Sequence, residues 1–233
     1  AEPSGRQFDD LTLLTRNMGG SSLKPNDRVP FNPMVNAGAI MTTGLINPED
    51  TPTERLQYIR EEFGRLIGWF KPKNASYYRG QKIEKKSNID MPRFNKNVAR
   101  QENFTGYNNI ATGFLLMATG NLPHSGTEIE EDKHKDSEYE FDFHVEPGVT
   151  NAFILYFSLC SLEMTAKDIA MAAATLANSG VCPVTQDRVL SQRTVRSCLP
   201  VMQMAGMYNG SGEFFQDIGL PAKSGVGGGI FLV

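Results

Sequence analysis

The chain has 233 residues, of which 40% are hydrophobic and 21% charged, with a formal net charge of −3. This size allows a substantial buried core in one large or two small domains. No apolar run approaches the roughly 18 residues that span a bilayer, and the first residues lack signal or transit features, so we expect no membrane association. The acidic balance argues against nucleic-acid binding, and three scattered cysteines do not indicate a disulfide framework.

The first clear element is a helix over residues 51–68. Thr51 is a suitable cap, Pro52 suits the first helical position and Glu54 completes a capping box. Apolar residues then recur at three- and four-residue spacing until Gly68, which we expect to end the helix.

A basic segment and a second helix follow. Residues 71–100 are rich in Lys and Arg, and we interpret them as a solvated loop because aromatic residues are only scattered among them. The apolar stretch 105–120 predicts a largely buried helix that is capped by Thr105 and ends at Gly120.

The acidic segment 121–146 is likewise interpreted as a solvated loop. His124, His134 and His144 lie in or near it, but a ten-residue spacing matches no compact metal motif. We therefore predict no metal ion and no other cofactor.

Three helices are predicted in the rest of the chain. Residues 150–163 are apolar throughout and should be buried. Residues 165–180 are rich in alanine, start at the cap Thr165 and end at Asn-Ser-Gly. The helix over 191–207 should be interrupted near Pro200.

Candidate site residues lie in less charged stretches. Asn36 precedes Ala-Gly-Ala, which would let the backbone approach a ligand closely, while Glu102 lies just ahead of a predicted helix start and Asn109 lies in its first turns. Tyr156 carries a phenol in an apolar helix, where it needs a hydrogen-bond partner, and Tyr208 adjoins a glycine-rich turn.

Several long stretches occur in a characteristic order. "NPMVNAGAI", "LCSLEMTAKDIAMAAATLANSGVCPVT", "GMYNGSGEF" and "GLPAKSGVGGGI" together resemble the glutaminases of the serine-dependent β-lactamase-like type. The resemblance runs from about residue 30 to residue 233. It is interrupted by the charged segments 71–100 and 121–146, which look like insertions in one partial catalytic domain.

The resemblance implies an α/β (α+β) fold like that of serine β-lactamases and penicillin-binding proteins, truncated at both ends. An antiparallel sheet that holds residues 224–233 would pack on a helical cluster that holds Tyr156 and the alanine-rich helix, with the active-site cleft between them. The implied substrate is L-glutamine, which is hydrolysed to L-glutamate and ammonia. Dimers or tetramers that phosphate promotes are also implied, in mitochondria for an animal protein and in the cytoplasm otherwise.

Members of this family use a serine nucleophile in a Ser-x-x-Lys motif at a helix start. The single such motif here, Ser21 to Lys24, adjoins Gly-Gly and Pro25, so we expect a loop there and a nucleophile that lies upstream of the chain. The chain alone should then be inactive.

The resemblance also assigns roles in substrate binding. Asn36 resembles the asparagine that holds the amino-acid end of glutamine, and Glu102 resembles the carboxylate that pairs with its α-ammonium. Asn109, rather than Asn108, matches a second asparagine by its spacing of seven residues from Glu102.

The remaining assignments concern the scissile amide. Tyr156 and Tyr208 resemble two tyrosines that face it, and Tyr208 is our candidate for proton transfer, which requires a cation near the phenol. The backbone N–H of Val226 resembles part of an oxyanion hole on a strand edge. Lys223 would add positive potential and keep Ser224 oriented.

Two other interpretations stay open. One is another serine acyl-enzyme of the same fold, such as a β-lactamase or a peptidase, although these lack the "NPMVNAGAI" and "GMYNGSG" pair. The other is a non-catalytic scaffold or regulatory chain that keeps the fold without the Ser-x-x-Lys pair.

Overall fold

The computed structural model describes residues 32–69, 91–118 and 147–233. These residues divide into two compact units. The helical unit comprises residues 32–56, 94–118 and 147–162, and the hairpin unit comprises residues 57–69, 91–93 and 163–233.

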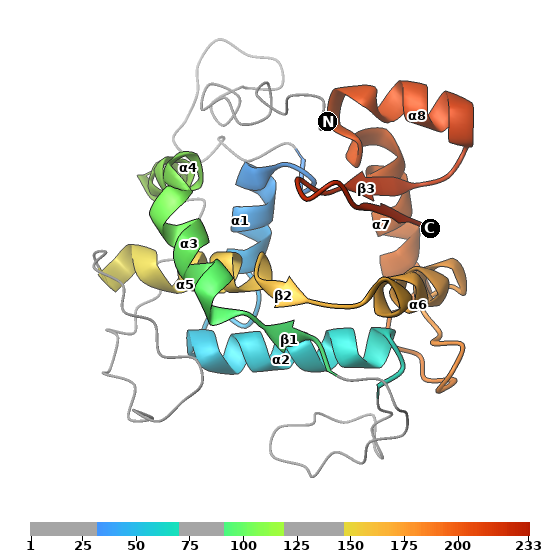
Figure 1. Ribbon diagram of the computed structural model, residues 1–233, viewed down its shortest axis with the longest axis horizontal. Coiled ribbons are helices and arrows are strands. Elements are labelled where there is room, and N and C mark those ends of the chain that lie inside the picture. Colours follow the sequence, from blue (N-terminus) through green and yellow to red (C-terminus); the bar gives the residue numbers. More distant parts are fainter. Residues whose placement is uncertain (1–31, 70–90, 119–146) are drawn as a thin grey trace. The chain divides into compact units, whose positions relative to one another are not determined.

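The helical unit is built from four helices. They are α1 (Asn36–Gly44), α3 (Lys96–Thr105), α4 (Tyr107–Ala118) and α5 (Pro147–Leu159). Helix α1 packs on α4 and α5, and α5 also packs on α3 and α4 (Figure 1). As the apolar sequence predicts, residues 153–157 of α5 are buried, and Ile40 of α1 and Leu116 of α4 are buried too.

Two glycines allow very close approach inside this unit. A Cβ atom at Gly113 of α4 would lie 1.8 Å from Cζ of Phe153 on α5. At Gly38 of α1 it would lie 1.9 Å from the carbonyl oxygen of Asn32. The Ala-Gly-Ala stretch thus accommodates the chain's own backbone, where the sequence had suggested room for a ligand.

The C-terminal end of α1 is held by a buried cation. The Arg55 guanidinium donates hydrogen bonds to the carbonyl oxygens of Thr43 (2.5 Å) and Ile46 (2.6 Å). Burial lowers the pKa of Arg55, and the charge of Asp50 opposes this shift. Arg55 thereby supplies further donors to the carbonyl groups at the end of this helix.

Helix α2 (Pro52–Leu66) contributes residues to both units. Its predicted capping box is confirmed, since Thr51 N–H donates to Glu54 Oε2 (3.0 Å) and Glu54 N–H donates to Thr51 Oγ1 (3.3 Å). Gly68 follows with a φ of 80°, as expected of a glycine that ends a helix.

The hairpin unit contains helices and an antiparallel strand pair. They are α6 (Ala166–Ala177), α7 (Gln192–Ala205), the 3₁₀ turn η4 (Tyr208–Gly210), α8 (Ser211–Ile218), β3 (Ala222–Ser224) and β4 (Ile230–Leu232). Lys223 pairs with Phe231 in the strand register. Helix α7 packs on α8 and β3, and α6 packs on β4 (Figure 1).

The alanine-rich helix α6 has the predicted boundaries. Thr165 and Asp168 form its capping box and Asn178 ends it. It belongs to the hairpin unit and α5 belongs to the helical unit, so the expected cluster of α6 with the helix that carries Tyr156 stays a prediction. Its contacts with β4 explain this assignment.

Two local predictions need correction. Strand β1 (Arg93–Phe94), which pairs with β2 (Leu162–Glu163), and helix α3 occupy part of the segment expected to be a loop. The Asn95 side chain caps α3 by accepting from the N–H groups of residues 97 and 98. Thr105 ends α3 and donates to the carbonyl of residue 101, so it does not cap α4.

Helices α4 and α7 also differ from the expectations. Tyr107 and Phe114 of α4 are exposed, so that helix is buried on one side only. Helix α7 continues through Pro200 without interruption. Pro200 is exposed, and water can therefore satisfy the carbonyl that lacks a helical N–H partner.

No helix within the described ranges is long and apolar enough to cross a membrane. All three cysteines, Cys160, Cys182 and Cys198, are free thiols. The acidic segment, the three histidines and the motif from Ser21 to Lys24 lie outside the described residues.

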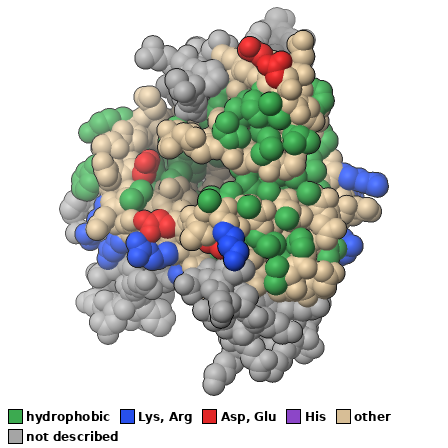
Figure 2. All heavy atoms as spheres, turned by 45° about the vertical axis from the view of Figure 1, so that its right-hand side comes forward, with side chains coloured by type: hydrophobic (Ala, Val, Ile, Leu, Met, Phe, Trp, Pro, Cys, Tyr) green, Lys and Arg blue, Asp and Glu red, His purple; other side chains and the backbone are tan. Residues whose placement is uncertain are grey.

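The hairpin unit carries a prominent apolar surface. Hydrophobic side chains gather on the face that Figure 2 turns forward, which carries α6, α7 and α8. Exposed large apolar residues of this unit include Phe215, Ile218, Leu220 and Ile230. Such a surface favours association with other protein.

We predict opposite effects of two Gly→Ala substitutions in the full-length protein. Gly113→Ala should lower the free energy of unfolding by roughly 1–3 kcal/mol or more, because the methyl group overlaps the Phe153 ring. Gly212→Ala in α8, where no atom lies within 4 Å, should raise it by about 0.5–1 kcal/mol. Urea unfolding followed by circular dichroism measures both, and equal effects would contradict the close α4–α5 contact.

Candidate active site

In the helical unit, two predicted site residues meet directly. The Asn36 side-chain Nδ2 donates a hydrogen bond of 2.9 Å to Asn109 Oδ1, across 73 residues of sequence. Asn36 is the first residue of α1, and Asn109 lies in the first turns of α4. Among the described residues this bond leaves Asn36 Oδ1 and Asn109 Nδ2 available, so the pair offers an acceptor and a donor.

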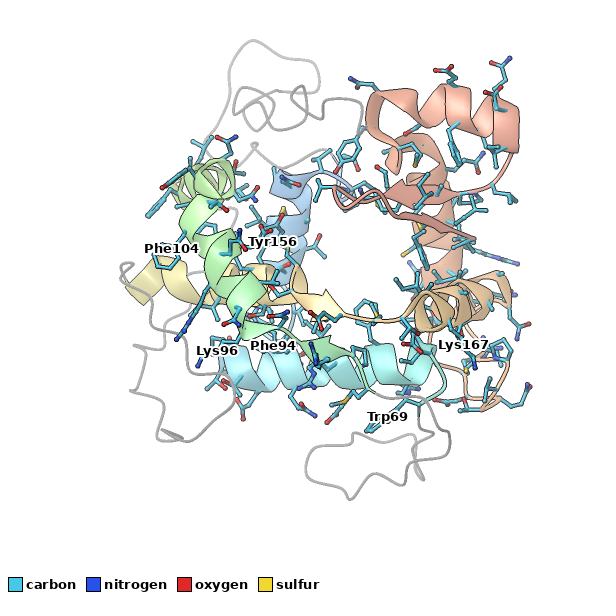
Figure 3. The ribbon with its side chains drawn as sticks, viewed as in Figure 1. Trp69, Phe94, Lys96, Phe104, Tyr156 and Lys167 are labelled. Carbon is cyan, nitrogen blue, oxygen red and sulfur yellow. The ribbon has the colours of Figure 1, made fainter. Side chains whose placement is uncertain are left out.

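Glu102 and Tyr156 both influence the thiol of Cys160. The Tyr156 side chain is hydrogen-bonded with the thiol, which supplies the partner that a buried phenol requires. Loss of solvation around the sulfur raises the pKa of Cys160 to about 11, although the residue as a whole is exposed, and the Glu102 carboxylate contributes further. Figure 3 shows Tyr156 of α5, and Glu102 lies within α3, shortly ahead of the start of α4 at Tyr107.

The hairpin unit brings Lys223 and Tyr208 together. Lys223 Nζ donates to Tyr208 Oη at 3.3 Å and lies 4.4 Å from the centroid of the same ring. It also donates to the backbone carbonyl of Ser224 at 2.7 Å. A cation in this position favours the charged phenolate over the neutral phenol.

A close backbone contact sets the distance between these two residues. A Cβ atom at Gly206 would lie 1.8 Å from the carbonyl oxygen of Ala222, so only glycine fits between the end of α7 and β3. Ser224 N–H also donates to the Gly206 carbonyl at 3.1 Å. Lys223 of β3 is thereby held beside the turn that carries Tyr208.

Tyr208 has a left-handed backbone conformation, with a φ of 53°. Residues other than glycine rarely adopt this conformation, which costs on the order of 1–3 kcal/mol. Ser211, which the sequence analysis did not single out, makes hydrogen bonds on both sides of this residue.

Val226 and Ser224 differ in detail from the expectations. Val226 is 88% exposed and lies in the turn between β3 and β4, not on a strand edge. In this turn, the Gly228 N–H donates a hydrogen bond of 3.0 Å to the Gly225 carbonyl. The Ser224 hydroxyl is buried and has no hydrogen-bond partner among the described residues, and Lys223 contacts the Ser224 carbonyl instead.

The two units thus each gather part of the predicted set. Asn36, Asn109, Glu102 and Tyr156 belong to the helical unit. Tyr208, Lys223, Ser224 and Val226 belong to the hairpin unit. Within the described ranges, no group of His, Cys, Asp and Glu residues is suited to hold a metal ion.

Comparison with known proteins identifies the family. The Glutaminase family profile matches residues 1–91 and 138–233, which is most of the sequence. The chain belongs to the glutaminase family. The curated relatives of this glutaminase-family chain include Glutaminase 2 of Clostridium perfringens, 34% identical over 98% of this chain and 58% of the relative.

Relatives in animals are longer. The mitochondrial liver isoform of rat glutaminase is 32% identical over the whole chain, which covers 30% of the rat protein. The glutaminase-family chain therefore spans between about a third and three fifths of the length of these relatives.

Solved glutaminases share its α+β fold. A Bacillus glutaminase matches with a TM-score of 0.70 at 28% identity, over 99% of this chain and 60% of that chain. A second match, at a TM-score of 0.65 and 28% identity, is a Bacillus subtilis glutaminase in a covalent complex with 5-oxo-L-norleucine. It covers 87% of this chain and 55% of that chain. The expected β-lactamase-like fold is thus confirmed.

We predict that Cys160 alkylates slowly. With a pKa of about 11 instead of 9.0, its thiolate fraction at pH 8 is roughly a hundredfold smaller, and the greater nucleophilicity of that thiolate leaves a rate about tenfold lower. Mass spectrometry measures the rate at which iodoacetamide alkylates Cys160 in the folded full-length protein. This rate is compared with the alkylation rate of Cys160 in the unfolded protein.

Glu102→Gln should accelerate this alkylation, because the substitution removes the negative charge that raises the thiol pKa. Glu49→Gln, which changes an exposed residue of the same unit, is the matched control and should have no effect. Equal rates in the wild type and Glu102→Gln would contradict the placement of Glu102 beside the thiol.

Proposed function

We propose that the protein that carries this chain hydrolyses L-glutamine to L-glutamate and ammonia. The observation that carries the proposal is the Lys223–Tyr208 contact of 3.3 Å in a chain of the glutaminase family. A phenol beside an ammonium group is suited to transfer a proton near neutral pH, which amide hydrolysis requires.

The helical unit supplies the groups that bind the amino-acid end of the substrate. In the proposal, Glu102 pairs with the α-ammonium of glutamine as a charge-assisted hydrogen bond. Asn36 and Asn109, already joined by their own hydrogen bond, present the remaining amide oxygen and amide nitrogen to the substrate. Tyr156 of α5 lies next to this group through the Cys160 thiol.

The chemistry then proceeds through an acyl-enzyme. A serine hydroxyl adds to the side-chain amide carbon and gives its proton to the ionised Tyr208, and the backbone N–H of Val226 helps to stabilise the oxyanion that forms. Tyr208 passes this proton to the amide nitrogen as the C–N bond breaks, and ammonia leaves. Water then attacks the resulting ester, and Tyr208 accepts the proton of the water and returns it to the serine oxygen as glutamate is released.

A covalent route has support among the relatives. The Bacillus subtilis glutaminase forms its covalent complex with 5-oxo-L-norleucine by reaction with 6-diazo-5-oxo-L-norleucine. We propose that the nucleophile of the present protein is a serine that lies before residue 32, outside the described part of the chain. The sequence gives Ser21 the wrong surroundings for this role, because Gly-Gly and Pro25 disfavour a helix there.

Labelling the full-length protein tests both the activity and the nucleophile. Wild-type protein should release ammonia from glutamine and should be inactivated by 6-diazo-5-oxo-L-norleucine, with the adduct on a serine other than Ser21. An adduct on Ser21 would overturn the exclusion of this serine. A non-catalytic scaffold would neither release ammonia nor become labelled.

We predict that Glu102→Gln raises KM for glutamine about ten- to a hundredfold in the full-length protein. Hydrogen bonds to charged groups contribute on the order of 1.5–3 kcal/mol, and this substitution removes the charge that pairs with the α-ammonium. The exposed Glu49→Gln is the control, since it changes net charge equally. Steady-state ammonia release measures both, and an unchanged KM in Glu102→Gln would refute the role of this carboxylate.

We further infer that the full-length protein assembles as a dimer or tetramer that phosphate promotes. The exposed apolar residues of the hairpin unit support association of some kind. Light scattering with and without phosphate measures the oligomeric state, and a monomer under both conditions would refute this inference.

For an animal source we place the protein in mitochondria, as the rat relative's name states for that protein, and otherwise in the cytoplasm. Cell fractionation checks this.

A further inference from the structure

Ser211 makes two hydrogen bonds that enclose Tyr208. Its hydroxyl oxygen accepts from the Met207 N–H at 3.0 Å and donates to the Tyr208 carbonyl at 2.7 Å. The side chain is nearly inaccessible, with 3% of the residue exposed. One hydroxyl therefore fixes the peptide groups on either side of the Tyr208 α-carbon.

The conformation of Tyr208 requires such a restraint. Its φ of 53° lies in the left-handed region, which glycine and asparagine adopt far more readily than an aromatic residue. Gly210, two residues later, has an ordinary φ of −84° and so does not use the freedom that glycine offers. The left-handed position in this turn is thus filled by the residue whose phenol contacts Lys223.

Capping of α8 does not account for Ser211. A helix cap accepts hydrogen bonds from N–H groups that lie further along the chain. The Ser211 hydroxyl bonds backward, to Met207 and Tyr208, and α8 has no side-chain cap. Its contacts therefore serve the turn that precedes the helix.

We propose that Ser211 is a positioning residue, whose hydroxyl holds the Tyr208 backbone in the left-handed conformation that places the phenol against Lys223. This role rests on the proposed function of Tyr208 in proton transfer. Ser211 itself touches neither the substrate nor the reacting atoms in this scheme. Without its hydroxyl, the turn relaxes and the phenol leaves its place beside the ammonium group.

The first test is the kinetics of Ser211→Ala in the full-length protein. We expect kcat for glutamine to fall roughly ten- to a hundredfold, as for a reacting group displaced by about 1 Å. KM should stay within about twofold, because Tyr208 acts on the scissile amide and the amino-acid end is held by other residues.

Ser161→Ala is the matched control. Ser161 is also buried, at 2% exposure, and its hydroxyl donates to the Phe157 carbonyl at 2.7 Å. Both variants lose buried hydrogen bonds and should melt at lower temperature, but Ser161→Ala should keep its kcat. A similar loss of kcat in both variants, or failure of Ser211→Ala to fold, would assign Ser211 a purely structural role and overturn the proposal.

A double-mutant cycle tests whether the effect passes through the phenol. In a Tyr208→Phe background, Ser211→Ala should change the residual kcat by less than about twofold, because the group that it positions is absent. An undiminished effect in that background would overturn the proposal.

A crystal structure of full-length Ser211→Ala decides the geometry independently of activity. We expect Tyr208 to leave the left-handed region and its hydroxyl to move beyond hydrogen-bond distance from Lys223. An unchanged Tyr208 would overturn the positioning role. A wild-type protein that releases no ammonia would instead refute the proposed function, while this structural comparison would still decide how Ser211 acts on the turn.

Discussion

The arrangement of the hairpin unit depends on the contact between Gly206 and the carbonyl of Ala222. The end of α7 and strand β3 approach so closely there that a single methyl group would overlap the backbone. This contact, with the Ser224 N–H bonded to the Gly206 carbonyl, sets the position of β3 relative to the turn that follows α7. Lys223 reaches Tyr208 because both lie within a few residues of that contact. The flexible side chain of Lys223 thus has a defined position, because both of its ends are fixed. Its backbone belongs to β3, and its ammonium group donates a hydrogen bond to the Ser224 carbonyl.

In the helical unit, other contacts fix the positions of the candidate site residues. Asn36 stands at the N-terminal end of α1, and the opposite end of that helix is fixed by the buried Arg55. The helix is also packed on α4 and α5, which carry Asn109 and Tyr156. Asn36, Asn109 and Tyr156 lie on three helices that are thus supported by one closely packed core. Rigid support of this kind keeps binding groups in place without the entropy cost of ordering them when the substrate arrives.

Features that depend on neighbouring residues were predictable from the sequence, and features that depend on distant ones were not. The capping boxes of Thr51 and Thr165 are local patterns, and both are present. Thr105 is a threonine like these two caps, but it ends α3. That helix is capped by Asn95, which lies ten residues earlier. The many charged residues of this segment indicated a loop, so the sequence did not predict α3. The candidate site residues came from resemblance to a family. No local rule predicts the bond between Asn36 and Asn109, because it forms only when α1 and α4 pack together.

The left-handed backbone of Tyr208 has a consequence for protein engineering. Glycine or asparagine at this position would relieve the unfavourable conformation, so a library that is screened only for heat resistance should enrich replacements of this tyrosine. Such variants would lose the phenol beside Lys223. In the proposed mechanism, stability and turnover therefore favour different residues at position 208, and a screen for active variants must hold this residue constant or measure both properties in every clone.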